Sequence, residues 1–122
     1  GRQVRDILHV RDAVRAYRQA FASIDEVQGR AFNLGGGTSN AVSLLQVLRE
    51  IAHATGEKPE INFEATRKGD QPYFVADTRA LGSTLGWEPT IGWKAGIRDL
   101  AEWLSAERGL GVRVPRRQRT TA

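Results

Sequence analysis

The chain has 122 residues, a mass of 13.5 kDa and a formal net charge of +4. This length suits one domain, and a hydrophobic share of 40% without any long apolar stretch is typical of a soluble globular protein rather than a disordered or membrane protein. Because cysteine is absent, disulfides, thiolate metal sites and cysteine nucleophiles are excluded, and we expect a cytoplasmic protein.

The first third of the chain predicts a strand, a helix and a second strand. An apolar run predicts a short strand over residues 4–10, interrupted by Arg5 and Asp6. A helix capped by Asp12 should follow, because apolar side chains recur there with helical spacing. They are Val10, Ala13, Val14, Tyr17 and Phe21. Residues 30–34 then predict a short strand that runs into a triple-glycine turn.

The middle of the chain contains the clearest helix signal. Ser43 and Gln46 have the spacing of a capping box, in which side chain and backbone satisfy each other's unpaired groups. The predicted helix stops at Gly56. Beyond it, apolar and polar residues alternate over residues 61–65, which predicts a half-buried strand.

The last part of the chain predicts an extended run over residues 73–76, a short helix capped by Asp77 and a final amphipathic helix over residues 93–104. Strands and helices therefore alternate, which indicates an α/β fold. The excess positive charge lies in residues 111–122, which contain four arginines and no acid. We expect these residues to form a disordered basic tail after a domain of residues 1–110.

Several common catalytic motifs are absent from the sequence. The triple glycine lacks the later glycine of a dinucleotide-binding turn, and no phosphate-binding P-loop is present. Neither Tyr17 nor Tyr73 has a lysine four residues later, the spacing that lets an ammonium activate a phenol on one helix face. His9 and His53 have no nearby carboxylate pair for a metal, and His9 is best read as a structural histidine. The chain thus carries no complete catalytic apparatus.

Charged residues in two places suggest a ligand. Arg5 interrupts an apolar strand, and Arg67 begins a charged turn that ends in Asp70. Two converging guanidinium groups suit a diphosphate, since each can donate two parallel hydrogen bonds to phosphate oxygens. The carboxylate of Asp70 could accept from ribose hydroxyls. Ordinary surface salt bridges are the alternative interpretation of the same residues.

The same residues belong to a longer pattern. It consists of the segments Val4–Ala13, Phe32–Gly37, Arg67–Gln71, Ala76–Ala80 and Leu85–Pro89. In this order and spacing the segments resemble the C-terminal portion of the nucleotide-sugar epimerases and dehydratases, which are extended short-chain dehydrogenases/reductases. Around Asp70 and Gln71 the pattern looks most like CDP-paratose (CDP-tyvelose) 2-epimerases, and then like UDP-glucose 4-epimerases.

The resemblance implies a substrate site for a CDP- or UDP-sugar. In the family, the arginines at the positions of Arg5 and Arg67 hold the diphosphate of the substrate. The acid at the position of Asp70 faces the ribose. Tyr73 or Phe74 would lie near the base. The resemblance implies no catalytic, cofactor-binding or metal-binding residue within this chain.

The resemblance also implies a fold and partners. The family's NAD and its catalytic tyrosine and lysine belong to an N-terminal Rossmann half, which this sequence lacks, so we expect the isolated chain to be inactive. In such folds the strand at residues 31–34 lies inside a parallel sheet, and without its neighbours it would expose an apolar edge. We therefore expect self-association, marginal stability or binding of an N-terminal Rossmann half.

A different class of function remains open. The basic tail could make the chain a small nucleic-acid-binding or protein-interaction module. Outside the tail, basic and acidic residues balance, and no basic surface with interleaved aromatic residues is evident. Nucleic-acid binding is therefore the less favoured interpretation.

Overall fold

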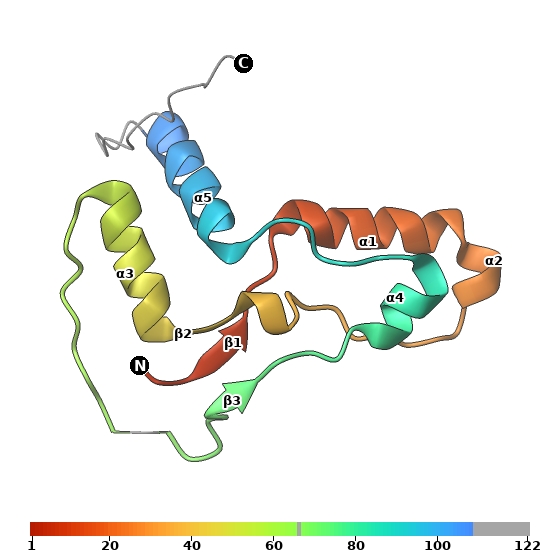
Figure 1. The fold of residues 1–122 in the computed structure, drawn as a ribbon, viewed down its shortest axis with the longest axis horizontal. Helices are drawn as coiled ribbons and strands as arrows, with labels where there is room; N and C mark the ends of the chain where they lie inside the picture. The colour runs from red at the N-terminus through yellow and green to blue at the C-terminus, as the bar shows by residue number, and fades with distance from the viewer. Residues whose placement is uncertain (66, 109–122) are drawn as a thin grey trace.

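The computed structural model describes residues 1–65 and 67–108, in which a three-stranded sheet packs with helices (Figure 1). The strands are β1 (Val4–Asp6), β2 (Ala41–Ser43) and β3 (Tyr73–Phe74). The helices are α1 (Val10–Ala22), α2 (Ile24–Val27), α3 (Leu44–Thr55), α4 (Arg79–Leu85) and α5 (Trp93–Arg108), with a 3-10 turn η1 (Thr38–Asn40). This mixture confirms the predicted α/β class.

β1 is the central strand of the sheet, whose order is β2-β1-β3. It runs antiparallel to β2 and parallel to β3. The register pairs Arg5 with Val42 on one side and with Phe74 on the other. The backbone N–H of Val4 also donates to the carbonyl of Pro72 at 2.9 Å. The sheet thus joins the start of the chain to the segment that follows the charged turn.

The core lies between α1 and α4. Ala16, Leu81 and Trp87 form its buried cluster. Partly buried side chains that pack against this cluster are Leu8, Phe32, Leu34 and Leu85. On the other side of the molecule α3 packs against α5, and Arg98 donates to the buried carboxylate of Glu50 at 2.8 Å (Figure 1). Two small packing layers therefore flank the sheet.

The predicted cap of the first helix is wrong. α1 begins at Val10, and His9 is its N-cap, with Nδ1 accepting from the N–H of Arg11 at 3.2 Å. Asp12 instead lies in the first turn, where its side chain turns inward and is only 1% exposed. Its oxygens accept from groups of the loop after α4, the N–H of Thr90 at 3.0 Å and of Ile91 at 2.9 Å. The carboxylate that the local pattern predicted to cap the helix therefore makes tertiary hydrogen bonds instead.

The predicted start of α3 is confirmed. The N–H of Gln46 donates to Ser43 Oγ at 3.3 Å, the N–H of Ser43 donates to Gln46 Oε1 at 2.8 Å, and the helix ends before Gly56, which has a φ of 75°. The cap predicted for the next helix is displaced by one residue. α4 begins at Arg79, whose N–H donates to Asp77 Oδ1 at 3.1 Å although Thr78 occupies the cap position.

Two predicted strands are not formed within the described residues. Residues 30–34 and 61–65 have no strand partner, and a strand needs a neighbour for its backbone groups. The side chains of Phe32 and Leu34 pack against the core, and their segment forms no strand, so the expected apolar sheet edge is absent from the described residues. The first strand is also shorter than predicted, because β1 ends at Asp6. The next N–H, that of Ile7, donates to the carbonyl of Asn40, which precedes β2. The extended run predicted over residues 73–76 is a strand only at β3.

One apolar face of α1 is open. Val10, Val14, Tyr17 and Phe21 lie on this face, the α1 stripe, and Phe21 is 79% exposed. The helical spacing of these residues is confirmed, but the buried side of the helix carries Asp12 and Ala16 instead. Four large apolar side chains on one exposed helix face are typical of a surface that another chain or segment covers.

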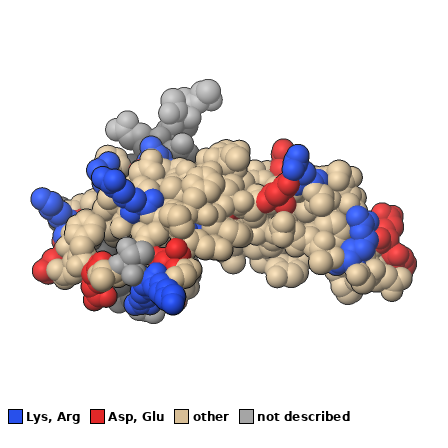
Figure 2. Space-filling view, turned by 90° about the horizontal axis from the view of Figure 1, so that it is seen from below, with Lys and Arg blue, Asp and Glu red and all other residues tan. Residues whose placement is uncertain are grey.

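Charges of both signs are mixed over the molecule. On the face shown in Figure 2, Lys and Arg lie among Asp and Glu toward the two ends, with uncharged surface between them. The described part of that face therefore carries no continuous basic surface. The predicted basic tail lies outside the described residues. Within residues 1–65 and 67–108, no helix has the length and apolar character needed to cross a bilayer.

Candidate functional site

The candidate site begins with Arg5 on the central strand. Its side chain is 37% exposed, and Nη1 donates to the carbonyl of Val4 at 2.8 Å. Nη2 lies 3.4 Å from Oδ1 of Asp70, a residue 65 positions later in the chain. This ion pair is long for a charge-assisted hydrogen bond. Arg5 is therefore held near Asp70 but remains accessible for a stronger anionic ligand.

The charged turn positions the second arginine. The N–H of Asp70 donates to the carbonyl of Arg67 at 3.1 Å, which closes the turn. Gly69 has a φ of 85°, a conformation that favours glycine. Arg67 is exposed, and within the described residues its guanidinium has no ion-pair or hydrogen-bond partner. An exposed guanidinium without such a partner is available to bind an anion.

Arg67 and Asp70 line one open cleft of about 600 Å³. The same lining contains apolar side chains, among them Leu44, Leu48, Ile61 and Phe63, together with polar Asn62 and Glu64. A cleft that combines charged groups with apolar side chains has the two kinds of contact that a nucleotide needs, for its phosphates and for its base.

The predicted aromatic pair lies beside this cleft rather than in its lining. Tyr73 and Phe74 form β3 and are 61% and 48% exposed. Phe74 is in register with Arg5, so the two residues are neighbours across the sheet. Arg5, like the aromatic pair, does not line the cleft, and it reaches the site through its contact with Asp70. Of the five predicted residues, Arg67 and Asp70 line the cleft itself.

Gln3 is a site residue that sequence reasoning missed. Its Nε2 donates to Oδ2 of Asp70 at 2.8 Å, and it lines the same cleft. Side chains two residues apart in extended backbone point to the same side, so the spacing of Gln3 and Arg5 could have indicated that Gln3 lies near the site. This spacing is a weak indication, because polar side chains two residues apart are common where strands begin.

The acid after Arg5 has a structural role. Oδ2 of Asp6 accepts from the N–H of Gly37 at 3.2 Å and of Ala76 at 3.1 Å. A Cβ on Gly35 would lie 2.1 Å from that same oxygen. Asp6 therefore connects the glycine turn to the segment after β3.

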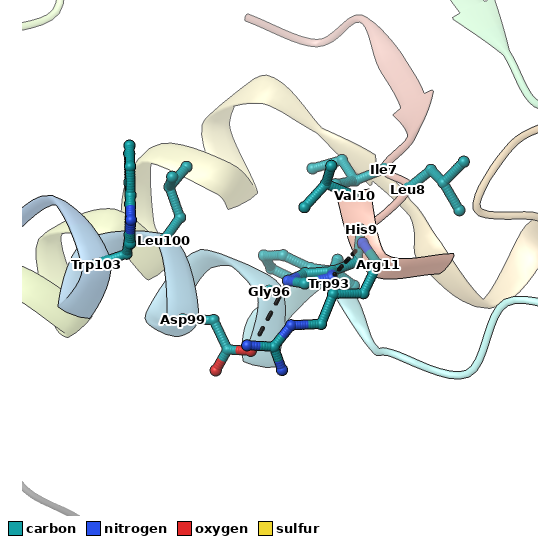
Figure 3. Close-up of a pocket in the computed structure, with 10 residues that line it drawn as sticks. All are labelled: Ile7, Leu8, His9, Val10, Arg11, Trp93, Gly96, Asp99, Leu100 and Trp103. Atoms are coloured by element: carbon teal, nitrogen blue, oxygen red, sulfur yellow. Dashed lines mark hydrogen bonds and ion pairs between the residues drawn. The ribbon is translucent and has the colours of Figure 1, made fainter. Parts of the chain in front are cut away.

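A second cavity, of about 520 Å³, lies between the start of α1 and α5 (Figure 3). Its apolar lining includes Trp93, Leu100 and Trp103. His9 and Asp99 contribute polar groups, with Nε2 and Oδ2 3.7 Å apart. Because the other ring nitrogen of His9 caps α1, both nitrogens are engaged, in agreement with a structural histidine. Among residues 1–65 and 67–108, no group of three or more potential metal ligands is found.

Comparison with known proteins was made for sequence and for fold. No protein-family model matches the chain. It is 32% identical over 106 residues to CDP-paratose 2-epimerase of Salmonella typhi, covering 87% of this chain and 31% of the relative. MoeE5 in complex with UDP-glucuronic acid and NAD superposes with a TM-score of 0.76 at 36% identity, covering 90% of this chain and 35% of that one. The chain is a relative of the nucleotide-sugar epimerases.

The fold comparison agrees with the sequence comparison. UDP-glucose 4-epimerase from Stenotrophomonas maltophila, solved with NAD and formylated UDP-arabinopyranose, has a TM-score of 0.74 at 28% identity, covering 88% of this chain and 32% of that one. The chain matches the C-terminal part of such epimerase folds, as the sequence pattern implied. It spans about a third of the length of these relatives. The predicted relationship to the extended short-chain dehydrogenases/reductases is therefore confirmed.

Proposed function

We propose that this chain is the nucleotide-sugar-binding part of an epimerase and holds a CDP- or UDP-sugar. Arg5 and Arg67 bind the diphosphate, Asp70 accepts from the ribose hydroxyls, and Tyr73 or Phe74 lies against the base. The observation that carries this proposal is the proximity of Arg5 and Asp70, which are 65 positions apart in sequence and 3.4 Å apart in space.

The charges at the site support a diphosphate rather than a neutral ligand. Arg67 has no ion-pair partner among the described residues, and Arg5 has only a long one. Each phosphate of a diphosphate offers a pair of oxygens that can accept two parallel hydrogen bonds from one guanidinium. The cleft lining itself is balanced, with Arg67 and Lys68 against Glu64 and Asp70. Arg5 beside Asp70 adds one further positive charge that a bound anion would neutralise.

We assign no step of the epimerase reaction to this chain. In the parent family NAD supplies the redox chemistry, and the triple-glycine turn here lacks the later glycine of a dinucleotide-binding turn. A Cβ on Gly36 would lie 2.0 Å from the carbonyl oxygen of Ile7, so protein atoms already fill that side of the turn. This turn therefore does not fit the dinucleotide, and we propose that NAD is held outside this chain and that the chain is inactive alone.

We propose that the partner of this chain is an N-terminal Rossmann half. The alternative partner is a second copy of the chain. The exposed α1 stripe supports this proposal, since an apolar face of this kind is costly to leave in water. The limited coverage of the relatives, about a third of their length, agrees with a covering segment elsewhere in the parent fold.

The proposal is tested by calorimetric titration of the 122-residue chain with UDP and CDP. Arg5→Ala and Arg67→Ala should each weaken binding by at least about tenfold, because each removes a charge-assisted contact. Arg49→Ala is the matched control, since Arg49 is an exposed arginine on α3 outside the cleft lining. Equal affinities of all four chains, or no binding by any, would contradict the proposal.

A nucleic-acid-binding or protein-interaction module using the basic tail is the second candidate. Binding of nucleic acid through phosphates should fall steeply with salt and disappear when residues 113–122 are deleted. Nucleotide binding at the cleft should survive that deletion. The two functions therefore give opposite results with one truncated chain.

A further inference from the structure

We propose that Gln3 is a positioning residue that holds the carboxylate of Asp70 in the orientation needed for a ribose. This inference rests on the proposed function of the cleft. Both oxygens of Asp70 are used by β1 and the segment before it: Nε2 of Gln3 donates to Oδ2 at 2.8 Å, and Arg5 lies 3.4 Å from Oδ1. The shorter of the two contacts belongs to the neutral residue, so Gln3 fixes the carboxylate more firmly than the arginine does.

The other end of the Gln3 side chain supports this assignment. Its Oε1 is buried and accepts no hydrogen bond from any described residue. Leaving a buried acceptor unpaired is unfavourable, and such atoms in native folds call for an explanation. Here the explanation is the contact at the amide nitrogen, because turning the amide over would bury the NH₂ group and point an oxygen at the Asp70 carboxylate.

The backbone of Gln3 is anchored on two sides. The carbonyl of Gln3 accepts from the N–H of Leu44 at 3.2 Å, at the start of α3. The next residue, Val4, donates to the carbonyl of Pro72 at 2.9 Å, two residues after Asp70. The amide is therefore held at a fixed distance from the turn that carries Asp70, as a positioning residue requires.

Ligand binding makes this contact more important. A diphosphate competes with Asp70 for Arg5, because phosphate oxygens offer that guanidinium a stronger partner than a carboxylate 3.4 Å away. Once Arg5 turns to the phosphates, Gln3 is the described side chain that still restrains Asp70. Asp70 can then accept from ribose hydroxyls without first losing conformational freedom.

The test compares UDP with 2′,3′-dideoxy-UDP, which lacks the hydroxyls that Asp70 would bind. Calorimetric titrations are run on the wild-type chain, Gln3→Leu, the near-isosteric Gln3→Glu and Gln19→Leu. Gln19 is a matched control, because it also has a buried and unpaired Oε1 but lies on α1. We expect Gln3→Leu to weaken UDP binding by roughly tenfold and to leave binding of the dideoxy analogue unchanged. Gln3→Glu, which faces Asp70 with a like charge, should give the same pattern even if the leucine variant does not fold.

The outcomes separate this inference from the proposed function. UDP affinities that are equal in wild-type, Gln3→Leu and Gln3→Glu, with loss in Arg67→Ala, would overturn the role of Gln3 and leave the site intact. Equal losses for UDP and the dideoxy analogue, or the same loss in Gln19→Leu, would indicate a merely structural effect and also overturn it. A wild-type chain that binds neither ligand would overturn both proposals.

Discussion

The indole Nε1 of Trp87 donates to the backbone carbonyl of Asp12 at 3.0 Å, and these are the two largest fully buried side chains in the described part of the molecule. This contact joins the first turn of α1 to the loop after α4, 75 positions later. The carboxylate of the same aspartate accepts from Thr90 and Ile91. Asp12 therefore connects α1 to the loop after α4 through both its backbone and its side chain.

Replacing Trp87 with alanine should therefore remove much of the stability of the domain. The loss of a fully buried indole and its hydrogen bond should lower the free energy of unfolding by about 3–5 kcal/mol. Urea denaturation followed by circular dichroism measures this change. Trp103, which is 58% exposed, is the matched control, and its replacement should cost less than about 1 kcal/mol. Similar losses for the two tryptophans would show that the core is elsewhere.

Acid should destabilise the fold through Asp12. Burial alone would raise the pKa of this carboxyl, but hydrogen bonds from Arg15, Ile91 and Thr90 outweigh burial and lower its pKa from 3.8 to about 2. A lowered folded-state pKa stabilises the protein fully above the unfolded value near 4, and this stabilisation is lost as the pH falls toward 2. The shift corresponds to about 2 kcal/mol.

Asp12→Asn checks that assignment. At neutral pH it should lower the free energy of unfolding by about 2 kcal/mol or more, because the paired charge is lost. Between pH 4 and pH 2 the variant should lose less stability than the wild-type chain. If the free energy of unfolding fell by the same amount in the two proteins over that range, Asp12 would not be the cause of the acid sensitivity.

The triple-glycine turn should tolerate no side chain at its second position. A Cβ on Gly36 would lie 2.0 Å from the carbonyl oxygen of Ile7, so Gly36→Ala should cost about 3 kcal/mol or more. Gly92→Ala is the matched control, because its Cβ would meet no atom within 4 Å, and it should change stability by less than about 1 kcal/mol. Thermal unfolding of both variants gives the comparison, and a stable Gly36→Ala chain would contradict the packing of this turn.

The α1 stripe should drive self-association of the isolated chain. Phe21→Ser should shift sedimentation-velocity profiles toward the monomer, because Phe21 is the most exposed large apolar side chain among the described residues. Phe63→Ser is the control, since Phe63 is 72% exposed but lies outside the stripe. A wild-type chain that stays monomeric at all concentrations tested, or an equal effect of both variants, would show that the stripe does not mediate association.

Much of the local structure could be predicted because it depends on near neighbours. The capping box of Ser43 and Gln46 and the helical spacing of the α1 stripe are both local patterns, and both were correct. The strands at residues 30–34 and 61–65 were wrong because a strand exists only with a partner, which a short apolar run does not reveal. Asp12 was misplaced for a related reason, since its partners lie far along the chain.

The site was predicted only in part. Arg5 stands out within an apolar strand, and Arg67 and Asp70 stand out as a charged turn. Gln3 does not stand out, because an amide near a strand end has no distinctive pattern, and its role depends on a contact across 67 positions. The pairing of β1 with β3 brings the start of the chain to the segment after the charged turn, and no single segment encodes that register.

The measurement that tests the central proposal most directly is a ¹H–¹⁵N correlation spectrum of the chain titrated with UDP and with CDP. A nucleotide-binding cleft predicts shifts at Gln3, Arg5 and residues 67–74, which saturate with added nucleotide and disappear in Arg67→Ala. Dispersed resonances that do not respond to either nucleotide, or that respond only in residues 111–122, would contradict the account.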